Sequence, residues 1–247
     1  MPFTKRDEMA RVFSYVEVDS TQDEAKRLIA NGVQPPFFVV AEKQTKGRGR
    51  LGRSWVSEEG GIWLTYAMIP AQGINPLVYS YGAALAIKDV VEELGISTRL
   101  RWPNDVFVLK AKVCGILCEA DYYGSGSAMR LIRLGIGLNV NNDVSKVIAP
   151  YPVISLKMVT GYMLDTDQLK RAMISRLEEF LSEPDKESIL KRYQSALDII
   201  GKTVRIKTKH SSLLGKALGL DEEGLLVIEE EGTKEKLHLV EGELEEE

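Results

Sequence analysis

The sequence is poor in the residues that build disulfide frameworks and imidazole chemistry. Its 247 residues include two cysteines, Cys114 and Cys118, and two histidines, His210 and His238. Two cysteines cannot form a disulfide framework, and their spacing within a strand-like run predicts two small buried hydrophobic side chains without a metal. Both histidines fall near the C-terminus. A Ser-His-Asp or Cys-His site in the main part of the chain would therefore lack its imidazole.

Long apolar runs are also missing. The longest nearly uncharged stretch, residues 60–87, is interrupted by Pro70, Gly73 and Pro76, whereas a membrane-spanning helix needs roughly 20 apolar residues. The N-terminus has no apolar core typical of a secretion signal. A composition of 44% hydrophobic and 28% charged residues with a net charge of −4 is typical of a soluble globular chain. We expect a cytoplasmic protein that binds neither membranes nor DNA.

Charge is unevenly distributed along the chain. Residues 43–57 contain five basic residues and no acidic one, which indicates a local anion site. The segment from Ile199 onward contains seven basic and twelve acidic residues, and five of the acidic ones lie in the last seven residues. We interpret that acidic end as a solvated tail.

Periodicity and capping signals predict helices and strands in two blocks. Helices are expected over residues 21–31, 76–94, 166–182 and 185–200. Strands are expected over residues 37–41, 62–69, 98–101, 106–109, 112–120 and 129–140, the last three as an antiparallel meander. After Gly201, short β-type pieces alternate with turns, as in a small barrel. The change of pattern predicts a domain boundary near residue 200.

The basic segment contains Gly47-Arg-Gly-Arg-Leu-Gly52, which has the GxGxxG spacing of dinucleotide sites. No helix signal follows it, and no acidic residue occurs between Ile62 and Lys88 to hold a ribose. Phosphate would instead be bound by arginine guanidinium groups and glycine backbone NH groups. The loop would become ordered only when the anion binds. The alternative is a solvated basic turn.

A second cluster combines a rigid turn with a lysine. Arg101-Trp-Pro-Asn-Asp105 places an amide and a carboxylate at a sheet edge, and Lys112 opens the next apolar strand. An ordinary turn and a solvent-exposed lysine are the alternatives. If these groups share a site, it acts by positioning and charge neutralisation, as phosphoryl or adenylyl transfer requires.

Together these segments resemble the biotin protein ligases. The matching segments, in order, are Ser20-Thr21, AEKQTKGRGRLGRSW at 41–55, RWPND at 101–105, KVCGIL at 112–117 and GIGLNVN at 135–141. The resemblance implies an α+β fold, in which a mixed, mostly antiparallel sheet flanked by helices forms a class II synthetase-like catalytic domain. That domain would span residues 1–200, and residues 201–247 would form an SH3-like β-barrel with the acidic tail.

The resemblance also implies an activity. Such a ligase joins biotin to ATP, with Mg²⁺ as cofactor, to give biotinyl-5′-AMP, and passes the biotinyl group to one lysine of a biotin carboxyl carrier protein. Many bacterial members carry an N-terminal helix-turn-helix repressor domain, for which Ser20 comes too early here. Exposed sheet edges would allow two chains to pair as a homodimer.

Site residues follow from the resemblance position by position. Arg48 and Lys112 are expected to be catalytic, stabilising charge on the α-phosphate. The expected biotin contacts are Ser20, Thr21, Gln22, Gln44, Arg48, Gly49, Arg50, Lys112 and Gly115. The expected adenylate contacts are Arg50, Arg53, Trp55, Asn104 and Asn139. Asp105 is a candidate Mg²⁺ ligand whose alternative role is to fix its turn.

Three positions depart from the common family pattern. Arg101 stands where a lysine is usual, Gln22 where asparagine is frequent, and Leu51 where some members have a basic residue. A lipoate-protein ligase shares the fold and the acyl-adenylate chemistry but not the GRGRxGRxW segment. The alternative from another functional class is a non-catalytic module that holds RNA or a phosphorylated partner. The net charge and the 7% aromatic content argue against that module.

Overall fold

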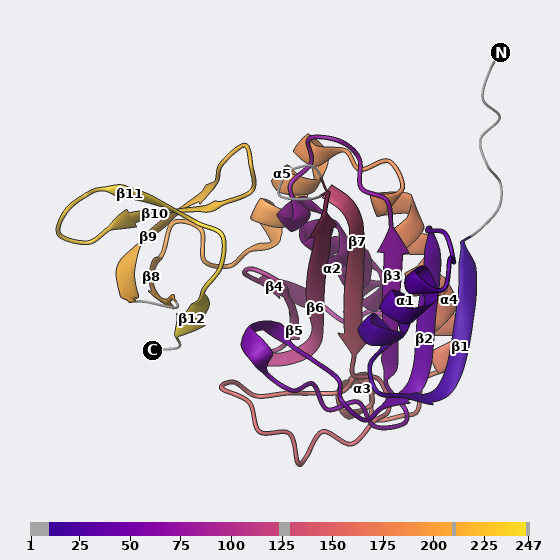
Figure 1. Ribbon diagram of the computed structural model, residues 1–247. Coiled ribbons are helices and arrows are strands. Elements are labelled where there is room, and N and C mark those ends of the chain that lie inside the picture. Colours follow the sequence, from indigo (N-terminus) through magenta and orange to yellow (C-terminus); the bar gives the residue numbers. More distant parts are fainter. Residues whose placement is uncertain (1–9, 124–128, 209–210, 246–247) are drawn as a thin grey trace.

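A seven-stranded sheet forms the centre of the larger part of the molecule (Figure 1). The computed structural model describes residues 10–123, 129–208 and 211–245. The strand order is β1-β2-β3-β7-β6-β5-β4, and every neighbouring pair is antiparallel except β1 and β2. The strands are β1 (Arg11–Val18), β2 (Phe37–Gln44), β3 (Ile62–Met68), β4 (Thr98–Arg101), β5 (Asp105–Val108), β6 (Ala111–Tyr122) and β7 (Met129–Leu138).

Helices cover both faces of this sheet. α1 (Thr21–Ala30) packs on one face, where Phe37, Val39 and Ala67 are buried with Ala25. α2 (Pro76–Glu92), α4 (Thr166–Leu181) and α5 (Lys186–Ala196) cover the other face and form the larger core with the sheet. A short helix, α3 (Leu156–Thr160), follows the loop after β7. The sheet is therefore buried between unequal helical layers.

Local sequence explains where helices α1 and α2 begin. The Ser20 hydroxyl accepts a hydrogen bond from the Gln22 NH group at 3.3 Å, and the Asn75 side chain accepts one from Leu77 at 3.0 Å. These caps satisfy backbone NH groups that lack a partner within the helix. Because Ser20 caps α1 at the end of β1, the first turn of that helix lies at the edge of the site.

A second, five-stranded antiparallel sheet lies beside β4 and β5 (Figure 1). Its strand order is β11-β10-β9-β8-β12. The strands are β8 (Thr203–Lys207), β9 (Ser212–Leu220), β10 (Leu226–Glu230), β11 (Lys236–Leu239) and β12 (Glu243–Glu245). The Gln194 side chain of α5 accepts a hydrogen bond from the Leu220 NH group at 2.6 Å, which ties this sheet to the helical layer.

The predicted fold class is confirmed, as is the β5–β6–β7 meander. The structure adds β1 and α3, which were not predicted. The helix expected over 185–200 ends at Ala196, because Leu197 turns into extended backbone and bridges Leu100. The solvated tail is wrong for Glu243–Glu245, which form strand β12. His210 lies outside the described residues, and the division at residue 200 stays a prediction.

Candidate active site

A cavity of about 640 Å³ opens between the larger sheet, the loop after β2 and the C-terminal segment. All of the residues predicted from the sequence as biotin, adenylate or metal contacts line it. They are Ser20, Thr21, Gln22, Gln44, Arg48, Gly49, Arg50, Arg53, Trp55, Asn104, Asp105, Lys112, Gly115 and Asn139. The structure thus brings together segments that are far apart in the sequence.

One side of the cavity is a buried hydrogen-bonded cluster. The Gln44 side-chain oxygen accepts from the Thr21 NH group at 2.8 Å and from its hydroxyl at 3.1 Å. The Gln44 amide nitrogen donates to the Ser57 hydroxyl at 2.8 Å. Thr65 donates to the Thr21 hydroxyl at 2.9 Å. These bonds fix the orientation of the Gln44 amide before any ligand contact.

Gln22 places an unused acceptor in the same region. Its amide nitrogen donates to the Leu117 carbonyl at 3.0 Å and to the Arg133 carbonyl at 3.4 Å. Its side-chain oxygen is buried and has no hydrogen-bond partner among the described residues. A Cβ at Gly135 would come within 3.0–3.2 Å of the Gln22 side chain. Glycine at 135 therefore makes room for the long amide, and the orphaned oxygen suits an N–H donor of a ligand.

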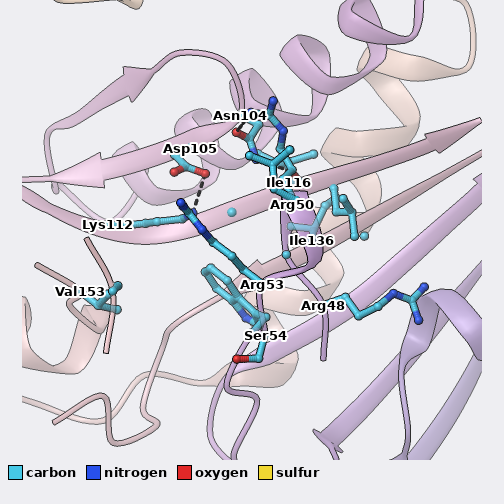
Figure 2. A pocket seen from close by; sticks show the side chains of 18 of the residues that line it. Arg48, Arg50, Arg53, Ser54, Asn104, Asp105, Lys112, Ile116, Ile136 and Val153 are labelled. Carbon is cyan, nitrogen blue, oxygen red and sulfur yellow. Dashed lines mark hydrogen bonds and ion pairs between the residues drawn. The ribbon is translucent and has the colours of Figure 1, made fainter. Parts of the chain in front are cut away.

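Arg48 lies at the cavity wall with its guanidinium bound to carboxylates of its own chain. It pairs with Asp23 of α1 and, at 3.3 Å, with Glu119 of β6. Figure 2 shows the guanidinium directed away from Lys112. The hydrogen bond to Asp23 outweighs partial burial and raises the pKa of Arg48. To contact an anion beside Lys112, Arg48 has to exchange these carboxylates for it.

The other two arginines of the loop reach the second sheet. Arg50 donates to the Asn104 side-chain oxygen at 3.0 Å and pairs with Glu241 at 3.3 Å. Arg53 pairs with Glu243. The loop itself is a narrow hairpin, in which the Gly49 NH group donates to the Arg53 carbonyl at 2.7 Å. Each predicted phosphate-binding arginine thus has a carboxylate partner within the chain.

Lys112 forms a buried ion pair with Asp105 (Figure 2). Its Nζ lies 2.7 Å from Asp105 Oδ1, and the Tyr151 hydroxyl donates to Asp105 Oδ2 at 2.9 Å. Burial alone would lower the pKa of Lys112, but Asp105 and Tyr151 outweigh it and raise the pKa above its ordinary 10.5. Lys112 is therefore a cation at the cavity wall at neutral pH.

The same pair argues against a metal at Asp105. A divalent ion needs several oxygen ligands, and the Asp105 carboxylate is already occupied by an ammonium and a phenol. Within residues 10–123, 129–208 and 211–245, three or more Asp, Glu, His or Cys side chains nowhere converge as metal ligands would. In the structure the Asp105 carboxylate is engaged by Lys112 and Tyr151, and both its role as a Mg²⁺ ligand and its role in fixing the turn stay predictions.

Trp55 lies across two glycines of the central strands. A Cβ at Gly137 would come within 2.4 Å of the indole nitrogen, and one at Gly115 within 3.0 Å of the ring. The Lys112 ammonium is 5.0 Å from the indole ring centre. The Trp55 indole nitrogen is buried and lacks a partner among the described residues. Glycines at 115 and 137 are therefore needed for an aromatic group to reach the sheet.

Asn139 presents a second unused donor. Its side-chain oxygen accepts from Asn142 at 3.0 Å, which fixes the orientation of the amide. Its amide nitrogen is buried and unpartnered in the part of the chain that the structure describes. A donor held in this way suits a ring nitrogen of a base.

Sequence reasoning missed part of the wall. Tyr151 lies in a proline-flanked segment, 147–153, which gave no motif, although a tyrosine between two prolines was a usable signal. Glu243 was assigned to a solvated tail, yet it lines the cavity with Gly242 and Leu244. Arg101 donates to the Leu244 carbonyl at 2.7 Å and stacks over Tyr151. Nothing in the local sequence indicated these contacts between the two sheets.

Comparison with known proteins agrees with this geometry. The Biotin/lipoate A/B protein ligase family matches residues 14–139, and the Biotin protein ligase C terminal domain matches residues 199–243. The fold and cavity thus define a ligase, and the chain belongs to the Biotin/lipoate A/B protein ligase family.

Its relatives within that family are biotin ligases. The chain is 32% identical to the bifunctional ligase/repressor BirA of Bacillus subtilis, over 93% of this chain and 73% of that protein. It is 30% identical to the biotin--[acetyl-CoA-carboxylase] ligase of Paracoccus denitrificans, over 85% of this chain and 90% of the relative. The biotin protein ligase of Aquifex aeolicus, solved with biotin and ATP, matches with a TM-score of 0.76 and 30% identity, covering 95% of this chain and 97% of that one.

Proposed function

We propose that the chain activates biotin with ATP to form biotinyl-5′-AMP and transfers the biotinyl group to one lysine of a biotin carboxyl carrier protein. The observation that carries this proposal is the single cavity in which a buried amide cluster lies near one lysine and three arginines. A ligand that has a hydrogen-bonding ring at one end and a carboxylate at the other fits both parts. The family of the chain supports the same reaction.

The polar side of the cavity favours biotin over lipoate. The Gln44 amide is hydrogen-bonded to Thr21 and Ser57, and the buried Gln22 oxygen has no donor among the described residues. A ureido ring offers both N–H donors and a carbonyl acceptor, whereas a dithiolane ring offers neither. Binding a dithiolane ring would leave the buried Gln22 oxygen unpaired, at a cost of about 1–3 kcal/mol.

In the adenylation step, the biotin carboxylate attacks the α-phosphate and pyrophosphate leaves. Two anionic groups must approach, so the cations at the point of attack lower the barrier. Lys112, kept protonated by Asp105, contributes one fixed charge. Arg48 contributes a second once its guanidinium leaves Asp23 and Glu119. Arg50 and Arg53 hold the leaving phosphates.

The adenylate end is formed by Trp55, Asn104 and Asn139. The indole covers the base, and the fixed Asn139 amide donates to its edge. Asn104 is held by the Ile116 carbonyl at 2.6 Å and orients Arg50. Mg²⁺ would accompany the triphosphate and neutralise part of its charge, without Asp105 as a ligand.

In the transfer step, the acceptor lysine attacks the carbonyl of the adenylate and AMP leaves. Holding the amine against the mixed anhydride supplies the rate enhancement, because no histidine is among the described residues that line the cavity. We also propose that two chains pair through their sheet edges. The catalytic domain would end near residue 200, where the second domain begins.

Biotinylation of a carrier domain tests the proposal. The chain is incubated with biotin, ATP, Mg²⁺ and a purified biotin carboxyl carrier domain, and the carrier is weighed by mass spectrometry. We expect one biotinyl group per carrier domain and none on a carrier in which the acceptor lysine is replaced by arginine. An unmodified carrier would refute the transfer step.

A further inference from the structure

Tyr81 of α2 joins the second sheet to the active-site turn through its hydroxyl. The hydroxyl donates to the Gly224 carbonyl at 2.9 Å and accepts from the Trp102 indole nitrogen at 3.2 Å. Gly224 lies in the turn between β9 and β10, and Trp102 lies in the turn between β4 and β5. Tyr81 is fully buried and is not among the residues that line the cavity.

The turn that contains Trp102 holds two of the cations of the site. Asn104 accepts a hydrogen bond from Arg50 at 3.0 Å, and Asp105 pairs with Lys112 at 2.7 Å. A displacement of Trp102 therefore moves the groups that orient both cations. Trp102 also lies against the second sheet directly, since a Cβ at Gly242 would meet its ring at 3.3 Å.

The surroundings of Tyr81 fix its ring and its proton. The ring stacks on Tyr193 of α5, with centres 3.9 Å apart and planes 13° apart. Burial raises the pKa of Tyr81 above its ordinary value, so the hydroxyl keeps the proton that it donates. Gly224 has a φ of +85°, and a Cβ there would lie 3.3 Å from the Tyr81 ring. The carbonyl approaches the hydroxyl this closely because residue 224 is glycine.

We propose that Tyr81 is a positioning residue for adenylation, which sets the turn at 102–105, and through it Arg50 and Lys112, relative to the second sheet. This inference rests on the proposed function, because its readout is formation of the adenylate. Tyr81 acts through Trp102 and touches no substrate. Its loss should affect the chemical step and the ATP side of the site more than the biotin side, where Thr21, Gln22 and Gln44 are held by other contacts.

Tyr193 provides a matched control. It is stacked on Tyr81 and equally buried, but its hydroxyl has no hydrogen-bond partner among the described residues. Tyr81→Phe and Tyr193→Phe remove the same atom from adjacent rings. Only the first breaks the connection between Gly224 and Trp102.

The experiment is biotin-dependent pyrophosphate exchange into ATP by the full chain, with kcat and the two KM values measured for the wild type and both variants. For Tyr81→Phe we expect kcat to fall about tenfold, because the variant loses both hydrogen bonds of the hydroxyl and frees the turn that orients Arg50 and Lys112. The KM for ATP should rise more than the KM for biotin. For Tyr193→Phe we expect all three parameters within about twofold of the wild type. Thermal unfolding of each variant serves as the control, and the folded fraction at the assay temperature should equal that of the wild type.

A second arm identifies the bond responsible. Trp102→Phe removes the donor at the other end of the same hydrogen bond and replaces Tyr81→Phe if that variant fails to fold. In a double-mutant cycle, the combined loss of kcat should be clearly smaller than the product of the single losses. Losses that multiply, or a Tyr81→Phe chain that behaves like Tyr193→Phe, would overturn the positioning role. A wild-type chain without exchange activity would instead refute the proposed function.

Discussion

Lys112 and Asp105 form an ion pair in which both side chains are about nine-tenths buried, with 2.7 Å between Nζ and Oδ1. Removing either partner leaves the other charge in a poorly solvated place. The pair raises the pKa of Lys112 above 10.5. The stability that it contributes is therefore present below pH 10.5 and is lost as the pH rises through the pKa of the folded state.

Asp105→Asn should make adenylation sensitive to alkaline pH. Without the carboxylate, burial lowers the pKa of Lys112, and we expect the alkaline limb of the rate profile to move down by about one to three pH units. The measurement is pyrophosphate exchange from pH 6 to about pH 10. In this range the wild type should show no alkaline limb from Lys112, and a variant that shows none either would contradict control of the Lys112 charge by Asp105.

Lys112→Ala should lose both activity and stability. Adenylation should fall about 100-fold or more, because a cation at the α-phosphate is gone. The isolated Asp105 carboxylate should cost about 3–5 kcal/mol of unfolding free energy, measured by urea denaturation. The double variant Lys112→Met/Asp105→Asn should recover much of the stability and none of the activity. Recovery of activity in the double variant would contradict the role of Lys112.

Arg48→Ala should lose activity alone. Its side chain is about one-third exposed, and its partners Asp23 and Glu119 reach solvent, so we expect a change in unfolding free energy below about 1 kcal/mol. Adenylation should fall about 100-fold. Arg176→Ala on α4, which breaks surface pairs with Glu93 and Glu179, is the control and should leave activity unchanged. Normal pyrophosphate exchange by Arg48→Ala would refute its assignment.

Glu243→Gln should strengthen pyrophosphate binding. Glu243 pairs with Arg53 at the cavity wall, and under the proposed phosphate-binding role of Arg53 it competes with the anion. Removing its charge should therefore lower the dissociation constant about threefold to tenfold at low salt and less at high salt. Isothermal titration with pyrophosphate measures the change. Glu245→Gln is the matched control, because Glu245 lies on the same strand and pairs with Arg205. Equal effects of both substitutions would indicate general surface charge instead of competition at Arg53.

Gly137→Ala should close the adenylate end. A methyl group there would lie 2.4 Å from the Trp55 indole nitrogen, so the indole must leave the sheet. We expect the KM for ATP to rise at least about tenfold, with a smaller effect on biotin affinity measured by titration. Unchanged values for ATP would show that the base does not lie beside Trp55.

Much of the fold could be predicted because its signals are local. The Ser20 and Asn75 caps and the apolar periodicity of residues 76–94 give α1 and α2 directly. β1 was missed because Arg11–Val18 mixes charged and apolar residues on an edge strand. Its place in the sheet comes from parallel pairing with β2, a non-local contact that no short segment reveals.

The site was predictable in its residues but less so in its contacts. Every contact that the ordered motifs predicted, from Ser20 to Asn139, lines the cavity. The pairs of Arg50 with Glu241 and of Arg53 with Glu243 join residues about 190 positions apart. An acidic C-terminal segment looks the same in sequence whether it is solvated or folded onto an arginine loop.

The most direct test of the central claim is exchange of labelled pyrophosphate into ATP by the purified chain with Mg²⁺, using biotin, lipoate and octanoate in parallel. We expect exchange with biotin alone, because only its ureido ring offers an N–H donor to the unpartnered Gln22 oxygen. Exchange with lipoate or octanoate but not with biotin, or with none of the three acids, would contradict the assignment.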